Sequence, residues 1–331
     1  MRVLIALDKF RGTVTAAEAT AAVGHACWEL GHDADEAPMS DGGEGLLDVL
    51  GGANRSSIVT GPLGAPVEAS WRLAQRTAVI EMARASGLVL AGGPEANDPL
   101  ESSTFGTGEL IDRALEQGAR QVVVGLGGSA STDGGLGALR ALRSPPRLRS
   151  VDLQVACDVR TTFVDAAAVF APQKGATPAQ VALLTARLEG LAERYREEYG
   201  VNVRDLPGSG AAGGLAGGLA AVGGQLLPGF DLVAEHLSLD DRVAVADVVV
   251  TGEGYLDAQS LDGKVVGGVI ALAAAAGRPV VVIVGDADSD VTERLDGDAT
   301  VVSLVDRYGE TRPFTEPRWC IEHAAADALS A

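Results

Sequence analysis

Five apolar runs, each followed by an acidic residue, constrain the fold of this chain more than any other feature. Runs of this length, separated by helical patterns, are typical of buried parallel strands in α/β proteins. Open sheets of that kind bind ligands just beyond the carboxyl ends of their strands. The acids therefore mark a candidate binding edge, although an isolated Asp there is also a favoured helix N-cap. The runs are VLIAL before Asp8, VVVGLGGSAS ahead of Asp133, LQVAC before Asp158, VVVTG before Glu253 and VVIVG before Asp286.

The first 40 residues predict a βαβ unit, in which two parallel strands flank a helix. The run over residues 3–7 is apolar enough for a buried strand. A helix is expected to begin after Thr15, because Glu18 stands three residues later in the spacing of a capping box. Gly31 is expected to end that helix, and a second strand is expected over residues 34–39.

The middle of the chain departs from this parallel pattern. Residues 56–74 predict a hairpin that turns at LGAP, and residues 77–83 predict one more strand. The longest helix is expected over residues 178–199, with Thr177 as its N-cap and Gly200 as its end. Further strands are expected over residues 121–125, 151–157, 246–251, 279–285 and 299–305.

The charge balance excludes several classes of partner. The formal net charge is −19 and no cluster of basic residues occurs, so binding to nucleic acid or to an anionic membrane surface is not expected. The three cysteines lack the paired spacing of a zinc or redox site, and the first apolar run is too short for a signal peptide or a membrane span. We therefore expect a cytoplasmic protein, and its 331 residues suit two domains.

Lysine is scarce, which makes each lysine informative. Lys9, Lys174 and Lys264 stand beside 23 arginines, in the segments DKFRG, PQKGA and LDGKV. An ammonium group is a compact charge that suits phosphate, whereas a guanidinium is a planar fork. The three lysines are therefore candidates for phosphate or acid–base sites, and chance retention at the surface is the alternative for each.

Two glycine-rich loops could hold a phosphate. SDGGEG over residues 40–45 and GLGGSASTDGGLG over residues 125–137 each precede a helical stretch. Glycine lets backbone N–H groups approach a phosphate, although a tight strand-to-helix turn explains either loop alone. The GxGxxA match at 125–130 and the GxGxxG match at 208–213 lack the other features of dinucleotide sites, and no P-loop or protein-kinase motif occurs. A dinucleotide-dependent oxidoreductase is therefore the weakest functional alternative.

Nine motifs, in order along nearly the whole chain, resemble those of the type I glycerate kinase family. They are DKFRGT, PMSDGGEG, EMARASG, DPLESSTFGTGEL, GLGGSASTDGG, ACDV, VFAPQKGAT, LPGSGAAGGL and VVVTGEGYLDAQSLDGK. The resemblance implies ATP and Mg²⁺ as cosubstrate and metal, D-glycerate as acceptor, and 2-phosphoglycerate as the favoured product. It also implies two α/β domains enclosing a cleft, one a flavodoxin-like parallel sheet and the other a mixed sheet of restriction-endonuclease-like fold. We expect the first over residues 1–61 and 245–331, and the second, inserted, over residues 62–244.

The chain differs from the family's pattern at three positions and in one connector. The family's DSFKG is replaced by DKFRG, so Lys9 stands in place of a serine and Arg11 in place of a lysine. The family's GEGRID is replaced by GEGYLD, which puts Tyr255 in place of an arginine. The connector RSPPRLRS, over residues 143–150, is shorter than in the family. A kinase of another small hydroxy acid and a catalytically silent binding protein therefore stay as alternatives, and the sequence does not indicate the oligomeric state.

The motif positions give a hypothesis for the nucleotide and the metal. Mg-ATP is expected against the glycine-rich loops, with Lys264 and Lys174 neutralising phosphate charge. Asp158 or Glu253 is expected near the metal, because Mg²⁺ prefers carboxylate oxygens. The other residues expected at the nucleotide are Gly127, Gly128, Ser129, Gly213 and Gly214.

The acceptor site is expected around the loop after the first strand. Arg11 is expected to bind the acceptor carboxylate, because a guanidinium can hold both carboxylate oxygens. Asp257 or Asp41 is the candidate general base for the acceptor hydroxyl. Asp133 and Glu44 are expected as further acids of the site, and Asp8, Lys9 and Ser86 are expected near the acceptor.

Overall fold

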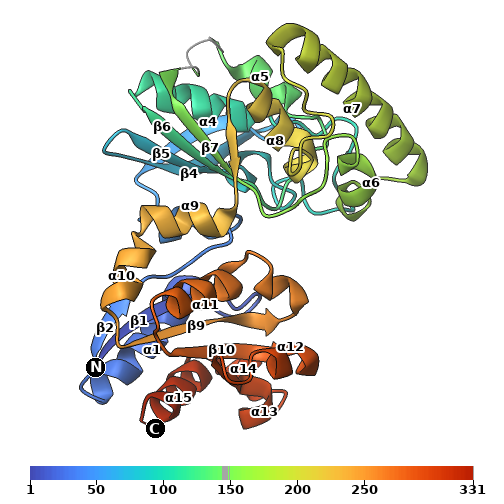
Figure 1. The fold of residues 1–331 in the computed structure, drawn as a ribbon. Helices are drawn as coiled ribbons and strands as arrows, with labels where there is room; N and C mark the ends of the chain where they lie inside the picture. Colours follow the sequence, from blue (N-terminus) through green and yellow to red (C-terminus); the bar gives the residue numbers. More distant parts are fainter. Residues whose placement is uncertain (144–147, 149, 331) are drawn as a thin grey trace. The chain divides into compact units, whose positions relative to one another are not determined.

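The computed structural model of the chain describes residues 1–143, 148 and 150–330, and it divides into two compact units. Unit 1 comprises Met1–Asp41, Asp48–Leu50 and Gly229–Ala331, and unit 2 comprises Gly42–Leu47 and Gly51–Pro228. Each unit packs helices on a β-sheet, one sheet entirely parallel and the other mixed, so the expected α/β fold class is confirmed (Figure 1). Most of the connector that was expected to be short, at residues 144–147 and 149, lies outside the described residues.

Unit 1 is built on a five-stranded parallel sheet with the order β11-β10-β9-β1-β2. Counted along the chain, this is the 2-1-3-4-5 order of flavodoxin-like folds, whose ligands bind where the order reverses, here between β1 and β9. The residues at 3–7 have no solvent exposure, which explains why this segment is an unbroken apolar run. The strands are β1 (Arg2–Leu7), β2 (Asp33–Glu36), β9 (Val248–Leu256), β10 (Val280–Ala287) and β11 (Thr300–Ser303).

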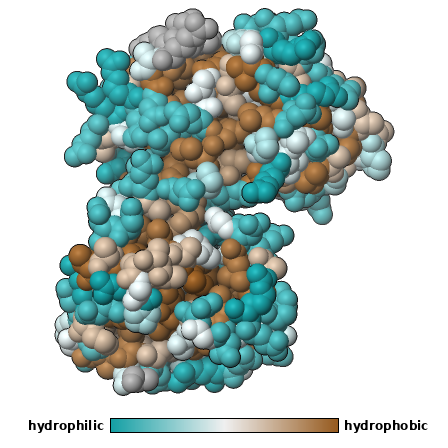
Figure 2. Space-filling model, viewed as in Figure 1, coloured by the Kyte–Doolittle hydropathy of each residue, from teal (hydrophilic) through white to brown (hydrophobic). Residues whose placement is uncertain are grey.

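Helices cover both faces of this sheet. Helix α1 (Ala16–Glu29) packs against β1 and against α15 (Pro317–Leu329), and these three elements share one apolar core. The expected capping box is present, because the Glu18 amide donates to Thr15 Oγ1 at 3.2 Å and the Thr15 amide donates to Glu18 Oε2 at 2.9 Å. Helix α11 (Val265–Ala275) contacts β9 and β10, and its sequence is so apolar that apolar side chains also reach the surface of unit 1 where it lies (Figure 2).

Shorter helices complete unit 1. Helices α9 and α10 contact α11, and α10 also contacts β1. Helices α13, α14 and α15 contact one another after the last strand. The bounds are α9 (Gly229–His236), α10 (Leu239–Val245), the 3-10 helix η3 (Ala258–Leu261), α12 (Ser289–Arg294), α13 (Leu304–Tyr308) and α14 (Arg312–Thr315).

Strands β9 and β10 extend further than the sequence indicated. The expected ends were residues 251 and 285, but the strands stay paired as far as Leu256 and Ala287. The glycines that suggested termination instead allow close pairing, since a Cβ on Gly252 would lie 1.8 Å from the Ile283 carbonyl oxygen. Glu253 therefore lies within β9, and the pairing of β9 with β10 fixes the position of its backbone. In contrast, the strands expected over 34–39, 77–83 and 299–305 end at residues 36, 81 and 303.

Unit 2 is built on a six-stranded mixed sheet with the order β3-β4-β5-β6-β7-β8. The expected hairpin is confirmed, because β3 pairs antiparallel with β4, and the chain turns between them over residues 61–65. The strand β4 also pairs antiparallel with β5, whereas the pairs from β5 to β8 are parallel. The strands are β3 (Arg55–Thr60), β4 (Pro66–Ala74), β5 (Thr77–Glu81), β6 (Gln121–Gly125), β7 (Asp152–Ala156) and β8 (Gln225–Leu227).

The longest helix of unit 2 confirms the sequence prediction to the residue. Helix α7 (Pro178–Tyr199) begins after Thr177, whose side chain caps it, and ends at Gly200 in the left-handed conformation. Helix α8 (Ala211–Ala221) is kinked, because residues 212–214 have positive φ angles. Other helices of unit 2 are α3 (Ala83–Ser86), α4 (Phe105–Glu116), α5 (Leu136–Ala141), α6 (Ala166–Phe170) and η2 (Pro172–Lys174), and α2 (Leu46–Val49) begins in unit 2 and ends in unit 1.

The two units differ in detail from the expected domain ranges. Strand β3 was expected with the first domain, but its pairing places it in the sheet of unit 2. Helices α9 and α10 were expected in the second domain but pack within unit 1, where Arg242 of α10 forms an ion pair with Asp35 of β2.

Among the helices that the structure describes, none has both the length and the apolar character that crossing a bilayer requires.

Candidate active site

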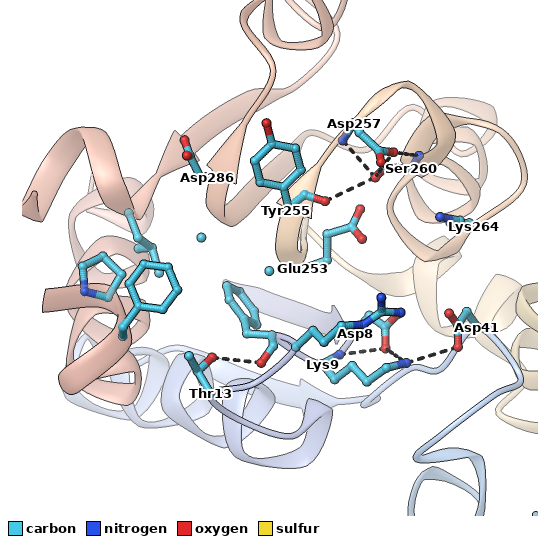
Figure 3. A pocket seen from close by; sticks show the side chains of 17 residues that line it. Asp8, Lys9, Thr13, Asp41, Glu253, Tyr255, Asp257, Ser260, Lys264 and Asp286 are labelled. Atoms are coloured by element: carbon cyan, nitrogen blue, oxygen red, sulfur yellow. Dashed lines mark hydrogen bonds and ion pairs between the residues drawn. The ribbon is translucent and has the colours of Figure 1, made fainter. Parts of the chain in front are cut away.

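A pocket of about 500 Å³ lies at the carboxyl edge of the sheet in unit 1 (Figure 3). Strands β1, β9 and β10 are parallel neighbours, so their carboxyl ends bring distant segments of the sequence to one place. The lining is highly charged. Its carboxylates are Asp8, Asp41, Glu253, Asp257 and Asp286, and its cations are Lys9, Arg11 and Lys264.

Asp8, Lys9 and Asp41 form an ion-paired cluster just after β1 (Figure 3). The Lys9 ammonium lies 3.2 Å from Asp41 Oδ1 and 3.7 Å from Asp8 Oδ1, and the Lys9 amide donates to Asp8 Oδ1 at 2.7 Å. Burial raises the pKa of Asp8 to about 6, with Lys9 opposing the rise and Asp41 adding to it. Burial alone would lower the pKa of Lys9, but the carboxylates of Asp8 and Asp41 outweigh it and raise that pKa. The ammonium therefore stays charged and holds the two acids together.

Glu253 is a second acid of the pocket whose ionisation is opposed by burial. Burial raises its pKa to about 7 and the nearby charge of Asp8 adds to the rise, while Ser260 and Lys264 oppose it in part. Its Oε1 atom is buried and has no hydrogen-bond partner among the described residues. A carboxylate oxygen left this way is costly unless a cation or a ligand donor pairs with it. Glu253 is therefore the clearest candidate for a residue that receives a ligand or a metal ion.

Asp257 has a partly structural role. It is the N-cap of η3, where its Oδ1 atom accepts from the Ser260 amide at 2.9 Å, and its own amide donates to Ser260 Oγ at 3.1 Å (Figure 3). Although burial opposes ionisation, these hydrogen bonds and the charge of Lys264 lower its pKa. Asp257 is thus ionised at neutral pH. One oxygen is engaged in the cap, and the residue also lines the pocket.

Lys264 and Arg11 supply positive charge from two different elements. Lys264 is the N-cap of α11, where the first backbone N–H groups of the helix add a favourable field for an anion. Arg11 is exposed in the loop between β1 and α1 and also lines the pocket. Both cations are therefore placed where a phosphate or a carboxylate can reach them.

An apolar wall closes another part of the same pocket. Tyr255 of β9 is held by its hydroxyl, which donates to Asp288 Oδ1 at 2.7 Å. The other apolar lining comes from the loop after β1, which is part of the DKFRGT motif, and from α13 and α14, which contain none of the nine motifs. These residues are Phe10, Leu304, Pro313 and Phe314.

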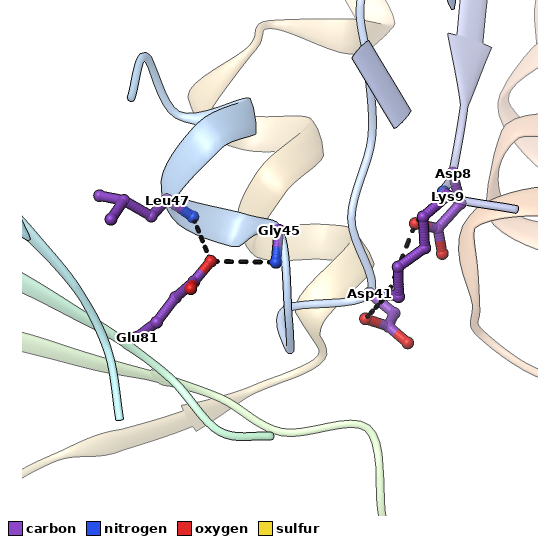
Figure 4. Close-up of polar contacts among 6 residues, drawn as sticks. All are labelled: Asp8, Lys9, Asp41, Gly45, Leu47 and Glu81. Carbon is purple, nitrogen blue, oxygen red and sulfur yellow. Dashed lines mark hydrogen bonds and ion pairs between the residues drawn. The ribbon is translucent and has the colours of Figure 1, made fainter. Parts of the chain in front are cut away.

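The end of the loop SDGGEG, which belongs to unit 2 from Gly42 on, is held by an acid that the sequence analysis did not select. Glu81 is the last residue of β5 and is nearly fully buried. Its Oε1 atom accepts from the amides of Gly45 at 3.0 Å and Leu47 at 2.9 Å (Figure 4). Its Oε2 atom accepts from Arg84 at 2.9 Å. The signal was present, because TAVIE is a further apolar run that ends in an acid.

Lys174 is buried in unit 2 beneath the glycine-rich loop over residues 125–137. Its ammonium donates to Ser129 Oγ at 2.7 Å and to the Ser131 carbonyl oxygen at 2.6 Å. Burial lowers the pKa of Lys174 to about 7, with partial compensation from Asp133. Because only 3% of the residue is exposed, its visible role is to hold this loop.

Asp133 of that loop and the predicted glycines of α8 also have structural explanations. Asp133 accepts hydrogen bonds from the amides of Thr104 at 2.8 Å, Gly135 at 3.0 Å and Gly137 at 3.1 Å, so both its oxygens are engaged. Gly213 has a positive φ, and a Cβ there would lie 2.1 Å from the Ser131 carbonyl oxygen. Close chain packing therefore accounts for the glycine, and Gly214 beside it also has positive φ.

The remaining predicted residues also belong to unit 2. Ser86 is fully buried, and its hydroxyl lies 2.9 Å from Thr107 Oγ1. Glu44 and Asp158 are exposed. Gly127, Gly128 and Ser129 form the turn after β6, where Ser129 bridges to Gly87.

The structure thus brings together part of the predicted site. The predicted residues that line the pocket are Asp8, Lys9, Arg11, Asp41, Glu253, Asp257 and Lys264. Ser260 and the apolar wall were not predicted. Asp286 was marked as an acid after one of the five apolar runs but was given no role, and the apolar wall depends on how the C-terminal segments fold back on the sheet.

Comparisons with known proteins converge on one family. The model of the glycerate kinase family matches residues 3–145 and 143–327. Glycerate 2-kinase of Escherichia coli K12 is 38% identical, over 88% of this chain and 87% of that protein. Glycerate kinase of Haemophilus influenzae is also 38% identical, over 94% and 93%. A crystal structure assigned as glycerate kinase 2, from Salmonella typhimurium LT2, aligns with a TM-score of 0.85 and 32% identity, over 100% of this chain and 97% of that one.

Proposed function

This chain belongs to the glycerate kinase family, and from that premise we propose that it transfers the γ-phosphoryl group of ATP to the 2-hydroxyl of D-glycerate, with Mg²⁺, giving 2-phosphoglycerate. The family establishes glycerate phosphorylation; the cosubstrate, the metal and the product are the proposal. The observation that carries it is the pocket at the β1/β9 switch point, where five carboxylates and three cations meet. Phosphoryl transfer needs just such a combination of metal ligands and anion-binding groups.

The acids of the pocket fit a magnesium ion. Glu253 has a buried oxygen without a hydrogen-bond partner among the described residues, and burial raises the pKa of both Glu253 and Asp8. A hard cation is bound by such oxygens and stabilises their ionised forms. We propose that Glu253 and Asp8 hold Mg²⁺, which would neutralise charge on the phosphate oxygens. Asp158 belongs to unit 2, and its predicted metal role stays a prediction.

The cations of the pocket suit the two anionic groups of the substrates. Lys264, at the N-terminus of α11, would neutralise the phosphates of ATP. Arg11 would bind the carboxylate of glycerate with two parallel hydrogen bonds. Because Lys9 is already paired with Asp8 and Asp41, its main effect is to position those acids.

Asp257 and Asp41 are the candidates for orienting the acceptor hydroxyl and accepting its proton. Asp257 is ionised at neutral pH, and its cap bonds use Oδ1. Asp41 lies beside the Lys9 ammonium, which can compensate its charge. A phosphoryl-transfer transition state is loose, so positioning of the hydroxyl contributes more than full deprotonation.

The predicted nucleotide residues of unit 2 stay predictions. Contacts within unit 2 give Lys174, Ser129 and Asp133 roles in holding their loop. Close chain packing explains Gly213, and the same region contains Gly214, Gly127 and Gly128. A cytoplasmic location also stays a proposal, and the three cysteines, which are all free thiols, are compatible with a reducing compartment.

A coupled assay of ADP release tests the proposed function. With Mg²⁺ and ATP, D-glycerate should give the largest kcat/KM among small hydroxy acids, and NMR of the product should show phosphate on the 2-oxygen. Phosphate on the 3-oxygen would refute the regiochemistry alone, and a better acid than glycerate would refute the acceptor. If ligands bind but none of the acids stimulates the release of ADP, the protein is catalytically silent.

A further inference from the structure

We propose that the apolar wall of the unit 1 pocket is a subsite for the base of a purine nucleotide, with Phe314 and Tyr255 as its stacking surfaces. This inference rests on the proposed use of ATP, which it extends by placing the base. It assigns a role to lining residues that phosphoryl transfer itself does not use.

The pocket has two chemically different parts. Asp8, Glu253 and Lys264 belong to a charged part that suits a metal, phosphates and a small acid. Phe10, Leu304, Pro313 and Phe314 offer neither charge nor side-chain hydrogen bonds, so a three-carbon hydroxy acid gains nothing from them. A ligand that matches both parts carries an anionic group at one end and a flat apolar group at the other, as a nucleotide does.

The size of the pocket agrees with this division. Its volume of about 500 Å³ lies in the range of sites that enclose drug-sized ligands. A three-carbon acid fills only a small part of that volume. A nucleotide uses the remaining space, including the side lined by aromatic residues.

Aromatic residues are more frequent in the lining of this pocket than in the chain as a whole. The whole sequence contains six Phe, four Tyr and three Trp, and Phe10, Tyr255 and Phe314 all line this one pocket. Phe314 is 67% exposed and Tyr255 is 51% exposed, whereas Phe10 is buried. Large aromatic side chains left exposed in a concave site offer faces on which a base can stack.

Two neighbouring acids make the subsite more specific. The bond from the Tyr255 hydroxyl to Asp288 fixes the position of that ring before a ligand arrives, which lowers the entropy lost on binding. Asp286 lines the pocket at the end of β10, and its Oδ1 atom accepts from the Ala287 amide at 2.9 Å. Its carboxylate can also accept from the hydroxyls of a ribose, which lies between the base and the phosphates of a nucleotide.

Calorimetric binding of ADP and of inorganic tripolyphosphate, which has no base, separates this subsite from the phosphate site. Phe314→Ala should weaken ADP binding about ten- to a hundredfold and leave tripolyphosphate binding within about twofold. Phe314→Tyr, which keeps the ring, should bind ADP like the wild type. Val89→Ala is the matched control, because Val89 is an exposed apolar residue of unit 2 and should change neither affinity.

The inference is overturned if wild-type protein binds no ADP, if Phe314→Ala binds ADP like the wild type, or if it loses tripolyphosphate binding equally. Turnover of ATP with glycerate by wild-type protein is measured separately. Absent turnover combined with weaker ADP binding by Phe314→Ala would refute the proposed function and support the subsite. Normal turnover combined with unchanged ADP binding by Phe314→Ala would support the proposed function and refute the subsite.

Discussion

Replacing Glu253 with glutamine tests whether its carboxylate is held ready for a cation. The substitution keeps the shape of the side chain and removes the charge that burial opposes. Burial raises the pKa of Glu253 from 4.5 to about 7. The folded protein therefore holds a proton on this group over a range of pH in which the unfolded chain has released it.

The size and sign of the effect follow from that difference in pKa. At about 1.4 kcal/mol per pH unit, ionising Glu253 in the folded state costs about 3 kcal/mol above pH 7. Its contribution to stability is fully present below pH 4.5 and is lost as the pH rises through 7. Glu253→Gln should therefore match the wild type near pH 4.5 and exceed its free energy of unfolding by about 3 kcal/mol at pH 8 in the absence of divalent metal.

Urea unfolding at pH 4.5 and pH 8, with and without Mg²⁺, measures both parts of the argument. Mg²⁺ binds the ionised carboxylate, so it should stabilise the wild type at pH 8, by about 2.7 kcal/mol when its concentration is a hundred times the Kd. It should have little effect at pH 4.5 or on Glu253→Gln. Glu235→Gln is the matched control, because Glu235 is an exposed acid of the same unit.

Two results would refute this reasoning. A difference between wild type and Glu253→Gln that is the same at both pH values would mean that burial does not oppose ionisation of Glu253. Equal stabilisation of both proteins by Mg²⁺ would mean that the metal is held by other groups.

Two further substitutions test the acceptor site. Arg11→Ala should lower kcat/KM for D-glycerate about ten- to a hundredfold, because a charge-assisted pair contributes about 1.5–3 kcal/mol. The KM for ATP should change little. A defect confined to ATP would refute the contact between Arg11 and the glycerate carboxylate. Asp257→Asn keeps the Oδ1 acceptor that caps η3, so the melting temperature should not change. The kcat should fall by about 10² to 10⁴. Near wild-type turnover in both Asp257→Asn and Asp41→Asn would mean that another residue is the general base.

The sequence predicted the parallel core well because burial on both faces leaves an unbroken apolar signal. The run at residues 3–7 and the long helix over 178–199 both lie where the pattern placed them. Residues whose packing partners are distant in the sequence were harder to predict. Gly252 was read as the end of a strand, but it allows two strands to approach closely, and that need is visible only once β10 is beside β9.

The same limit applies to the candidate site. Acids that follow apolar runs could be selected from sequence, because parallel strands carry their carboxyl ends to one edge. The division of those acids between two sheets could not be predicted, since it depends on strand pairing. Glu253 and Asp286 lie in strands of unit 1, whereas Asp133 and Asp158 come after strands of unit 2. Phe314 bears no local motif, and only the fold places it at the pocket.

Hydrogen-bond donors explain why acids with one sequence signature have different roles. Asp133 is surrounded by backbone amides, and Glu81 receives two amides and a guanidinium, so each carboxylate is satisfied and stabilises a loop. Glu253 has a buried oxygen without such a donor among the described residues, and burial raises its pKa. An acid whose charge is already compensated gains little from a ligand, whereas a buried acid with an oxygen that lacks a donor gains more. Whether an acid near the end of a strand can bind a ligand therefore depends on whether hydrogen-bond donors already pair with its carboxylate. That depends on its neighbours in three dimensions and not on the motif.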